Sequence, residues 1–333
     1  MREARADEAD RDGATTVSLD DVERAREAIG GRLHRTPAFT SRTLSELTGA
    51  GVRLKAELFQ RTGSFKPRGV LTNLAALSPD EKARGVIGIS AGNHAAALAY
   101  GAALEDISAL LVMWQGASEQ KIEATRAYGA DVDLAANGPG EAFDRLAELT
   151  ADSGRTLVHP FDSPATIAGQ GTVGLELVED VPDVHVVVVP IGGGGLIAGV
   201  ATAVNGLRPQ ARIIGVEPER SNAMRAALEA GEPVRIDPVS VADGLNAPFA
   251  GDDTLPIVRE LVDDIVLVTE DEIAEATRFL YGRAKLACEP AGAAATAALL
   301  AGKVAHEQDE SVVLVVSGGN VATATAVAIL AGR

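Results

Sequence analysis

The sequence predicts an α/β fold in which parallel strands are covered by helices on both faces. From about residue 86 onward, short apolar runs alternate with alanine-rich helical stretches, a pattern typical of parallel sheets buried between helices. The chain has 333 residues, 46% of them hydrophobic, which is enough for two domains or one large α/β unit. Glycine-rich turns follow several apolar runs, at the strand ends where such sheets bind ligands.

The first predicted element is a helix that follows a charged segment, residues 1–16, which we expect to be disordered. Ser18-Leu19-Asp20-Asp21 is a helix-start signature before the periodic residues 22–29, and Gly30-Gly31 ends the helix. Farther along, the apolar runs predicted as strands are 86–89, 109–113, 186–189, 213–216 and 312–316. The helical stretches among them include 117–128, 142–149, 197–207 and 271–286.

The composition excludes several classes of function. A net charge of -17 with no basic stripe argues against a nucleic-acid partner. The single cysteine, Cys288, fits a reducing compartment, and the five histidines include no pair at metal-ligand spacing. No signal-peptide core or membrane-length apolar run occurs. We therefore expect a cytoplasmic protein that binds no membrane and no zinc.

Lys66 is the first candidate for a catalytic residue. It lies in Gly63-Ser64-Phe65-Lys66-Pro67-Arg68-Gly69, where an aromatic residue, a proline and two glycines surround it. A lysine that condenses with a carbonyl must be immobilised and able to lose its proton, and this setting favours a held amine. Because a lysine in such a turn is more often solvated, the interpretation depends on the other turns.

Three turns at strand ends supply further binding groups. Ser90-Ala91-Gly92-Asn93-His94 opens a helix whose free amides suit a carboxylate or phosphate. Gly192-Gly193-Gly194-Gly195-Leu196 lets backbone amides close around a phosphate, and Ser317-Gly318-Gly319-Asn320 offers one hydroxyl. Alone, these turns also fit a plain helix cap, a flexible linker and a common turn. With Lys66 they predict a site for an aldehyde-and-phosphate cofactor that binds an amino acid.

The turns and several further segments together resemble the fold type II pyridoxal-phosphate enzymes, in the threonine dehydratase and serine racemase branch. The resemblance extends from about residue 18 to the C-terminus, in the family's order and spacing. The segments that carry it are Ser64 to Gly69, Ser90 to His94, Ile167-Ala168-Gly169-Gln170-Gly171-Thr172, Gly192 to Leu196, Ala242-Asp243-Gly244, Glu289-Pro290-Ala291-Gly292-Ala293 and Ser317 to Asn320.

The resemblance implies two open, twisted, mostly parallel sheets with helices on both faces. It implies a large cofactor-binding domain, residues 17–82 and 161–333, and a small substrate-closing domain, residues 83–160. Relatives are dimers or tetramers, so a homodimer or homotetramer is expected. The chain stops at Arg333, which leaves no room for the C-terminal domain of isoleucine-inhibited enzymes, so we expect a short catabolic-like or stand-alone form.

The resemblance also assigns roles around the cofactor ring. Lys66 would bind the cofactor, pyridoxal 5'-phosphate, covalently and then act as the base that removes the substrate's Cα proton. Phe65 and Gly244 would flank the ring, Asn93 would contact its hydroxyl, and Ser317 would meet its nitrogen. Because a neutral hydroxyl does not hold that nitrogen protonated, loss of a β-leaving group is favoured over transamination.

The anion sites follow from the same resemblance. The cofactor phosphate would bind Gly192, Gly193, Gly194, Gly195 and Leu196, and the substrate carboxylate would bind the turn formed by Ser90, Ala91, Gly92, Asn93 and His94. Family racemases have a second serine where this chain has Ala91, and alanine cannot carry a proton. We therefore expect β-elimination of L-threonine, and of L-serine, to 2-oxobutanoate or pyruvate plus ammonia, rather than efficient racemisation.

A divalent cation is not favoured. Several relatives bind one near the strand end that corresponds to Val216-Glu217-Pro218, with help from a second acidic residue. Residues 221–223, where that residue is expected, contain no carboxylate. Glu217 alone also fits a plain capping role.

Several alternatives remain open from the sequence. Gly193-x-Gly195-x-x-Ala198, with Glu217 about twenty residues on, fits an NAD-dependent oxidoreductase, although it leaves Lys66 unexplained. A non-catalytic amino-acid sensor would have no need of that lysine. Within the same fold, the chain could be a serine racemase or could act on hydroxyaspartate, 3-phenylserine or another β-hydroxy amino acid.

Overall fold

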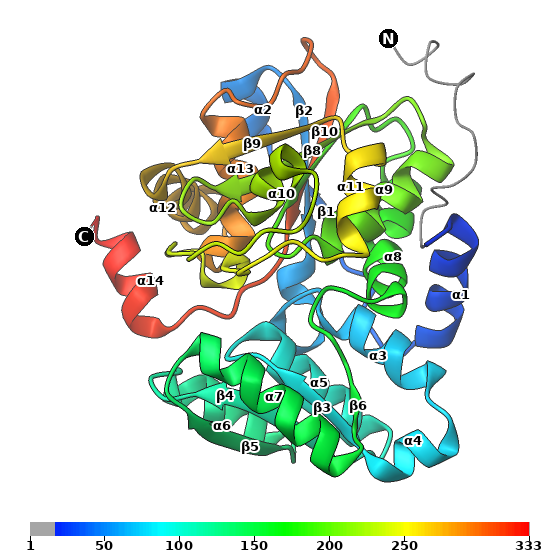
Figure 1. Ribbon diagram of the computed structural model, residues 1–333. Helices are drawn as coiled ribbons and strands as arrows, with labels where there is room; N and C mark the ends of the chain where they lie inside the picture. The colour runs from blue at the N-terminus through cyan, green and yellow to red at the C-terminus, as the bar shows by residue number, and fades with distance from the viewer. Residues whose placement is uncertain (1–16, 333) are drawn as a thin grey trace.

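The computed structural model describes residues 17–332 and contains two separate sheets (Figure 1). The larger sheet has six strands in the order β1-β2-β10-β7-β8-β9. Their bounds are β1 Ala38–Thr40, β2 Gly51–Ala56, β10 Ser311–Val316, β7 Val186–Pro190, β8 Arg212–Pro218 and β9 Asp264–Val268. All neighbours pair in parallel except β1, which runs antiparallel to β2.

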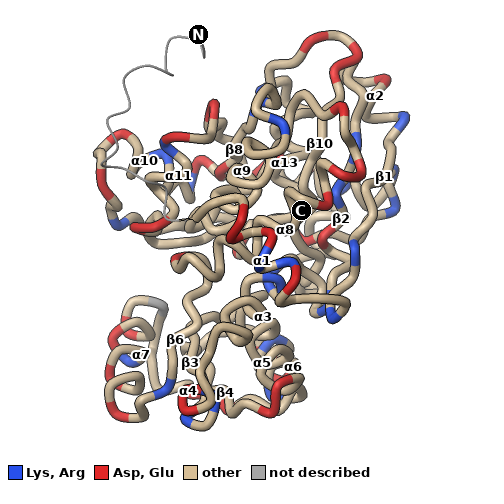
Figure 2. Tube along the Cα trace, turned by 90° about the vertical axis from the view of Figure 1, so that its right-hand side faces the viewer, with Lys and Arg blue, Asp and Glu red and all other residues tan. Residues whose placement is uncertain are grey.

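The smaller sheet has four parallel strands in the order β5-β4-β3-β6. Their bounds are β5 Asp131–Ala136, β4 Ala109–Trp114, β3 Val86–Ile89 and β6 Thr156–Leu157. This sheet, with helices α4 to α7, forms the lower lobe in Figures 1 and 2, which we call the small unit. The remainder is the large unit. The strands of the small sheet lie between residues 86 and 157, and the predicted division into domains at residues 83 and 160 stays a proposal.

The helices of the large unit are α1 Leu19–Ile29, α2 Arg42–Thr48, α3 Pro67–Ala76, α8 Pro164–Asp180, α9 Gly195–Leu207, α10 Ala223–Ala230, α11 Thr254–Leu261, α12 Glu270–Phe279, α13 Pro290–Leu300 and α14 Thr323–Leu330. Those of the small unit are α4 Pro79–Arg84, α5 Asn93–Leu104, α6 Glu119–Ala127 and α7 Pro139–Ser153. Among residues 17–332, no helix combines the length and apolarity that a membrane crossing requires.

The valine runs are buried on both faces because successive side chains of a strand point in opposite directions. In β7, Val187 and Val189 pack in the core beneath α1, α8, α9 and α11, whereas Val186 and Val188 pack in the core beneath α2, α12 and α13. The small sheet is likewise packed on both faces. The predicted fold, two mostly parallel sheets with helices on both faces, is confirmed.

The predicted element positions agree closely with the structure. The five predicted strands correspond to β3, β4, β7, β8 and β10, and the helix after Ser18 is α1, whose start is closed by a capping box between Ser18 and Asp21. The prediction of disorder for residues 1–16 lies outside the described residues. The strands that the sequence did not reveal, β1, β2, β5, β6 and β9, lie mostly at sheet edges.

A buried cluster of ionic side chains fixes the start of α3, directly after Lys66. Arg68 is 2% exposed and donates from Nε to Glu57 Oε2 at 2.8 Å and from Nη1 to Glu176 Oε1 at 2.8 Å. Lys55 Nζ donates to Glu176 Oε2 and to the Thr36 carbonyl, each at 2.7 Å. The cluster joins β2, α3 and α8, so each buried charge meets an opposite charge.

Candidate active site

A cavity of about 730 Å³ lies between the two units, and it brings together every site residue predicted from the sequence. Its lining includes residues of both units from segments far apart in the chain. The predicted residues found there are Phe65, Lys66, Ser90, Ala91, Gly92, Asn93, His94, Gly192, Gly193, Gly194, Gly195, Leu196, Gly244 and Ser317. The cavity lies at the carboxyl ends of β3, β7 and β10, as expected for parallel sheets.

The backbone around Lys66 is fixed by residues 62–65, which make a sharp turn and then pair with the turn after β10. Thr62 has φ 60° and Gly63 has φ 76°, in the left-handed region, which turns the chain sharply ahead of α3. Ser64 then forms a bridge with Gly318, and the Phe65 amide donates to the Ser317 carbonyl at 3.2 Å. Pro67 begins α3, so Lys66 stands at the start of a helix with both neighbours fixed.

The amine of Lys66 lies in the cavity with little to stabilise its charge. Its Nζ donates to the Pro160 carbonyl at 2.7 Å, and no ion pair to it is found among residues 17–332. Burial lowers the pKa of Lys66 to about 8, opposed by the carboxyl of Glu289. The uncharged amine, which a nucleophile or base requires, is therefore more accessible near neutral pH than in an ordinary lysine.

The glycine turn after β7 is shaped by its packing as well as by its expected ligand. Gly194 has φ 101°, and a Cβ at Gly193 would come within 2.4 Å of the Phe161 ring. The Gly193 carbonyl accepts from Thr254 Oγ1 at 2.8 Å, which anchors the turn from behind. Helix α9 begins at Gly195, so its free amides and positive dipole end adjoin the cavity.

The turn after β3 is organised by its own polar groups. Ser90 Oγ accepts from the Gly92 amide at 3.0 Å, and α5 begins at Asn93. His94 is 3% exposed, and its Nε2 lies 2.9 Å from the Val158 carbonyl. Burial, with the nearby Lys66, lowers the pKa of His94 to about 3, so the ring is neutral. His94 thus acts as a structural tie between α5 and the segment before Pro160.

Asn93 is the centre of a chain of hydrogen bonds that crosses the cavity. Its Nδ2 donates to Glu289 Oε1 at 2.6 Å, and its Oδ1 accepts from Asn320 Nδ2 at 2.8 Å. Asn320 Nδ2 also donates to the Thr62 carbonyl at 2.6 Å. These hydrogen bonds link the start of α5 to residues 62–65, which precede Lys66, and to the turn after β10.

Glu289 is a site residue that the sequence prediction missed. It lines the cavity, is 2% exposed, and faces Asn93. Burial, together with the charge of Asp243, raises its pKa to about 7. The available signal was a carboxylate directly before Pro290 in an otherwise apolar, alanine-rich stretch. Exposure to solvent does not explain a charged residue in such an apolar stretch.

Two further interactions close the cavity between the units. Lys121 of α6 forms an ion pair with Asp243 at 2.6 Å, and Phe143 of α7 packs on Phe249 with ring centroids 5.7 Å apart. The sequence did not reveal these contacts, because each pair joins segments more than 100 positions apart, although Asp243 lies in a segment that carries the resemblance.

Glu217, on which both the metal and the dinucleotide hypotheses depended, is occupied elsewhere. Its carboxylate accepts from the amides of Met224 and Arg225 at 2.8 and 2.9 Å, and so caps the start of α10. Burial raises its pKa to about 8. Because both oxygens are engaged by this helix, Glu217 is not presented to a ribose.

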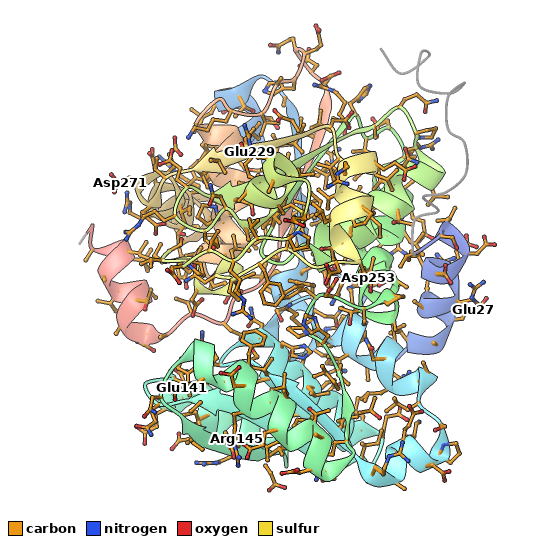
Figure 3. The ribbon with its side chains drawn as sticks, viewed as in Figure 1. Glu27, Glu141, Arg145, Glu229, Asp253 and Asp271 are labelled. Atoms are coloured by element: carbon orange, nitrogen blue, oxygen red, sulfur yellow. The ribbon has the colours of Figure 1, made fainter. Side chains whose placement is uncertain are left out.

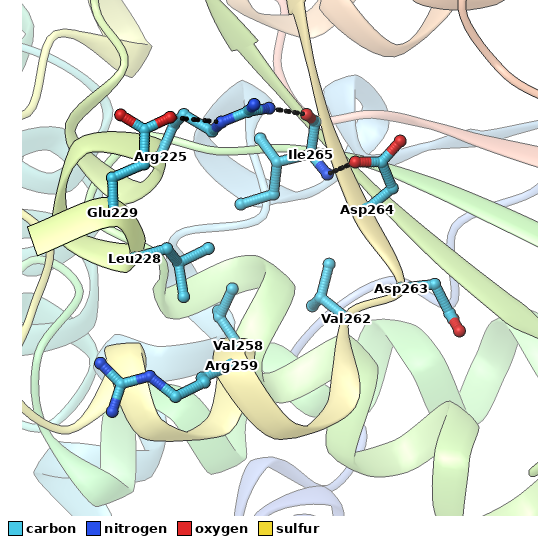
Figure 4. Close-up of a pocket in the computed structure, with 9 residues that line it drawn as sticks. All are labelled: Arg225, Leu228, Glu229, Val258, Arg259, Val262, Asp263, Asp264 and Ile265. Atoms are coloured by element: carbon cyan, nitrogen blue, oxygen red, sulfur yellow. Dashed lines mark hydrogen bonds and ion pairs between the residues drawn. The ribbon is translucent and has the colours of Figure 1, made fainter. Parts of the chain in front are cut away.

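A second cavity of about 300 Å³ lies between α10, α11 and β9 (Figure 4). Arg225 crosses its rim, donating to Glu229 at 3.0 Å and to the Ile265 carbonyl at 2.9 Å. None of the predicted site residues lines it. The chemistry predicted from the sequence therefore belongs to the larger cavity.

The residues of the larger cavity fit an aldehyde-and-phosphate cofactor. Lys66 supplies an amine of lowered pKa, and the turn of residues 192–195 supplies amides with no side chain in front of them. Ser317 is 4% exposed and lines the cavity, where its hydroxyl is placed to meet a ligand. Such a hydroxyl suits a ring nitrogen.

Comparison with known proteins identifies a family and several relatives of this chain. The model of the family described as pyridoxal-phosphate dependent enzyme matches residues 30–318. The catabolic L-threonine dehydratase TdcB of Escherichia coli is 43% identical over 307 residues, 92% of this chain and 93% of that protein.

Among solved structures, the T.th. threonine deaminase superposes with a TM-score of 0.86 at 41% identity, covering 92% of this chain and 99% of that one. Maize serine racemase superposes with a TM-score of 0.89 at 36% identity, covering 93% of this chain and 95% of that one.

Proposed function

Because the chain belongs to the family of pyridoxal-phosphate dependent enzymes, we propose that it catalyses the dehydration and deamination of L-threonine to 2-oxobutanoate and ammonia. L-Serine would give pyruvate and ammonia by the same route. The observation that carries the proposal is the position of Lys66 in one cavity with the glycine turn and Ser317. The relatives named as threonine dehydratase and threonine deaminase support the choice of substrate.

The proposed roles of the residues follow from their surroundings. The cofactor, when bound, supplies an aldehyde and an electron-withdrawing ring that stabilises negative charge at the substrate's Cα. Lys66 is the residue that holds the cofactor and moves the Cα proton, because its pKa of about 8 allows both protonation states near neutral pH. The amides of residues 192–195, at the start of α9, bind the phosphate.

The substrate carboxylate has a suitable site in the turn from Ser90 to His94. This turn precedes α5, and its amides lie at the positive end of that helix. Asn93 and Glu289 hold the turn in register with the large unit. We propose that this turn orients the Cα proton toward Lys66, on the opposite wall.

Ala91 decides between elimination and racemisation. Racemisation requires a second proton donor on the face opposite Lys66, and the Ala91 side chain, which lines the cavity, cannot supply one. The likeness to serine racemase makes this alternative specific. We propose that lyase activity predominates over conversion of L-serine to D-serine.

The decisive experiment measures keto acid and ammonia from L-threonine, L-serine, D-serine and 3-hydroxyaspartate with the cofactor-loaded enzyme. We expect L-threonine and L-serine to yield equal amounts of keto acid and ammonia. D-Serine formation from L-serine should be a minor product, and substantial racemisation would contradict the role given to Ala91. An absence of keto acid from all four amino acids would contradict the lyase function.

The assembly and the location of the protein are further proposals. We propose a homodimer or homotetramer in the cytoplasm, as the sequence predicts from its resemblance and from its single cysteine, Cys288. Light scattering of the purified protein gives its mass in solution. A monomer at micromolar concentration would exclude the proposed assembly.

A further inference from the structure

The chain concentrates its few aromatic residues around the active-site cavity. It contains eleven aromatic residues, namely seven phenylalanines, three tyrosines and one tryptophan. Four of these eleven line the cavity: Phe65, Trp114, Phe143 and Phe161. Phe249 packs directly behind, with its ring centroid 5.7 Å from that of Phe143 and 5.7 Å from that of Phe161. In a chain with only 3% aromatic residues, this placement calls for a role at the cavity.

Two of these residues form one wall with Ile89, which we call the outer wall: Ile89, Trp114 and Phe143. Trp114 ends β4, Phe143 lies on α7, and both are half-buried against the core around Ile89. On α7, Arg145 forms ion pairs within the small unit, with Asp133 at 3.0 Å and with Glu148 at 2.6 Å; Figure 3 labels Arg145 in the lower lobe. The outer wall is therefore a fixed apolar surface.

The wall adjoins open space. A Cβ built at Gly140, three residues before Phe143, would meet no atom within 4 Å. The cavity is also lined by the apolar residues Ile236, Pro238 and Pro248. The whole cavity, at about 730 Å³, lies in the upper part of the range of roughly 300–1,000 Å³ for small-molecule sites.

The charged groups at this end of the cavity leave the wall apolar. Lys121 and Asp243 pair with each other at 2.6 Å, and Arg235 lies over the Phe249 ring with its guanidinium 5.7 Å from the centroid. Asp237 is exposed and also lines the cavity. A substrate group that contacts Trp114 and Phe143 would thus meet carbon surfaces rather than charges.

We propose that the outer wall binds an apolar substituent on the substrate's β-carbon, and that the substrates include β-hydroxy amino acids with an aromatic side chain, such as L-threo-3-phenylserine. This inference rests on the proposed function and extends its substrate class beyond L-threonine. The Cα–H and Cβ–O bonds break, water leaves, and hydrolysis of the resulting enamine yields phenylpyruvate and ammonia. Stacking against Trp114 and Phe143 adds affinity beyond simple burial.

The first test measures binding without turnover. L-Phenylalanine and L-alanine lack a β-leaving group, and their binding to the cofactor-loaded enzyme is followed by the change in the cofactor's visible absorption. We expect L-phenylalanine to bind about tenfold more tightly than L-alanine. Trp114→Ala and Phe143→Ala should each remove most of this difference while leaving L-alanine binding unchanged.

A matched control is Tyr128→Ala. Tyr128 lies in the small unit, packs on Tyr100 and does not line the cavity, so this variant should bind both ligands as the wild type does. Trp114→Leu and Phe143→Leu keep apolar bulk and guard against a folding defect. If both ligands bind equally to the wild type, or if the wall variants weaken both alike, the aromatic residues only close the cleft and the proposal is wrong.

The second test compares kcat/KM for L-threo-3-phenylserine and L-threonine. We expect the wild type to use both, and the ratio to fall about tenfold in Trp114→Ala. If neither substrate yields keto acid, the lyase function fails, yet the ratio of phenylalanine to alanine binding still decides the role of the wall. If L-threonine alone reacts, the wider substrate class is wrong.

Discussion

Lys55, which is buried, and Lys66, which is half-buried, lie eleven positions apart in the sequence and have opposite surroundings. Lys55 is fully buried and its Nζ bonds to Glu176 and to the Thr36 carbonyl, each at 2.7 Å. Within residues 17–332 the Lys66 amine has one hydrogen bond, to the Pro160 carbonyl, and no ion pair; it lies 5.1 Å from the centroid of the Phe65 ring, and burial lowers its pKa to about 8. A reactive amine is thus produced by withholding the carboxylate partners that a structural lysine receives.

The largest expected effect comes from removing the unpaired lysine. Lys66→Ala should reduce ammonia release from L-threonine by at least about a thousandfold, because no other residue at the cavity has been assigned its acid-base role. The variant should remain folded, since only one hydrogen bond of the amine is lost. Lys82→Ala, which removes a partly exposed lysine paired with Glu105, is the matched control. Full activity in Lys66→Ala would refute the mechanism.

A substitution in the buried ionic cluster around Arg68 should instead lower the stability of the folded protein. Arg68→Met leaves the fully buried Glu57 without its partner, and we expect a loss of about 3–5 kcal/mol in the free energy of unfolding. Urea denaturation measures this loss. The double variant Arg68→Met with Glu57→Gln should recover part of it, because the unpaired charge is gone. An unchanged midpoint in the single variant would show that the cluster does not stabilise the start of α3.

Glu289→Gln tests how strongly a buried carboxylate charge near Lys66 destabilises the folded state. The folded pKa of Glu289 is raised from 4.5 to about 7, so the folded state keeps a proton that the unfolded state loses. The carboxyl of Glu289 therefore makes its full contribution to the stability of the folded state below pH 4.5, and this contribution is lost as the pH rises through 7. In protein freed of cofactor, the free energy of unfolding of the variant should exceed that of the wild type by roughly 1–3 kcal/mol between pH 5 and pH 8.

Glutamine keeps an oxygen that can accept from Asn93, so this comparison isolates the charge. Denaturant unfolding at several pH values measures the difference between the two proteins. A difference that stays constant between pH 5 and pH 8 would mean that Glu289 titrates normally.

The smallest effect is expected at an exposed pair. Arg42 and Glu46, whose side chains are 90% and 70% exposed, lie 3.7 Å apart on α2. Arg42→Ala should change the free energy of unfolding by less than about 0.5 kcal/mol. A loss comparable to that of Arg68→Met would show that burial does not set the worth of these ion pairs.

The same contrast explains what the sequence could predict. The valine runs that became β7 and β10 were recognised because both faces of these strands are buried. Strand β2 was missed because it contains Arg53 and Lys55, and the buried partners of Lys55 lie on α8, far away in the chain. A charged residue in a strand predicts exposure to solvent unless its ion-pair partner is known.

The site was predictable to a similar degree. Glycine turns and Lys66 carry local signals, and all of the predicted residues line one cavity. Trp114 could not be assigned from local sequence. Glu289 gave a local signal, a carboxylate before Pro290, but its role and that of Phe143 depend on contacts between the small and large units. The wall facing the substrate side chain is therefore visible only in the folded chain.

The position of β10 has a consequence for how the protein is made. β10 is the last strand in the sequence, yet it pairs with β2 on one side and β7 on the other in the middle of the large sheet. During synthesis, these two strands must wait with unpaired edges until the end of the chain leaves the ribosome. Ser317 and Asn320 arrive with it, so a nascent chain stopped before β10 has neither a joined sheet nor a complete site.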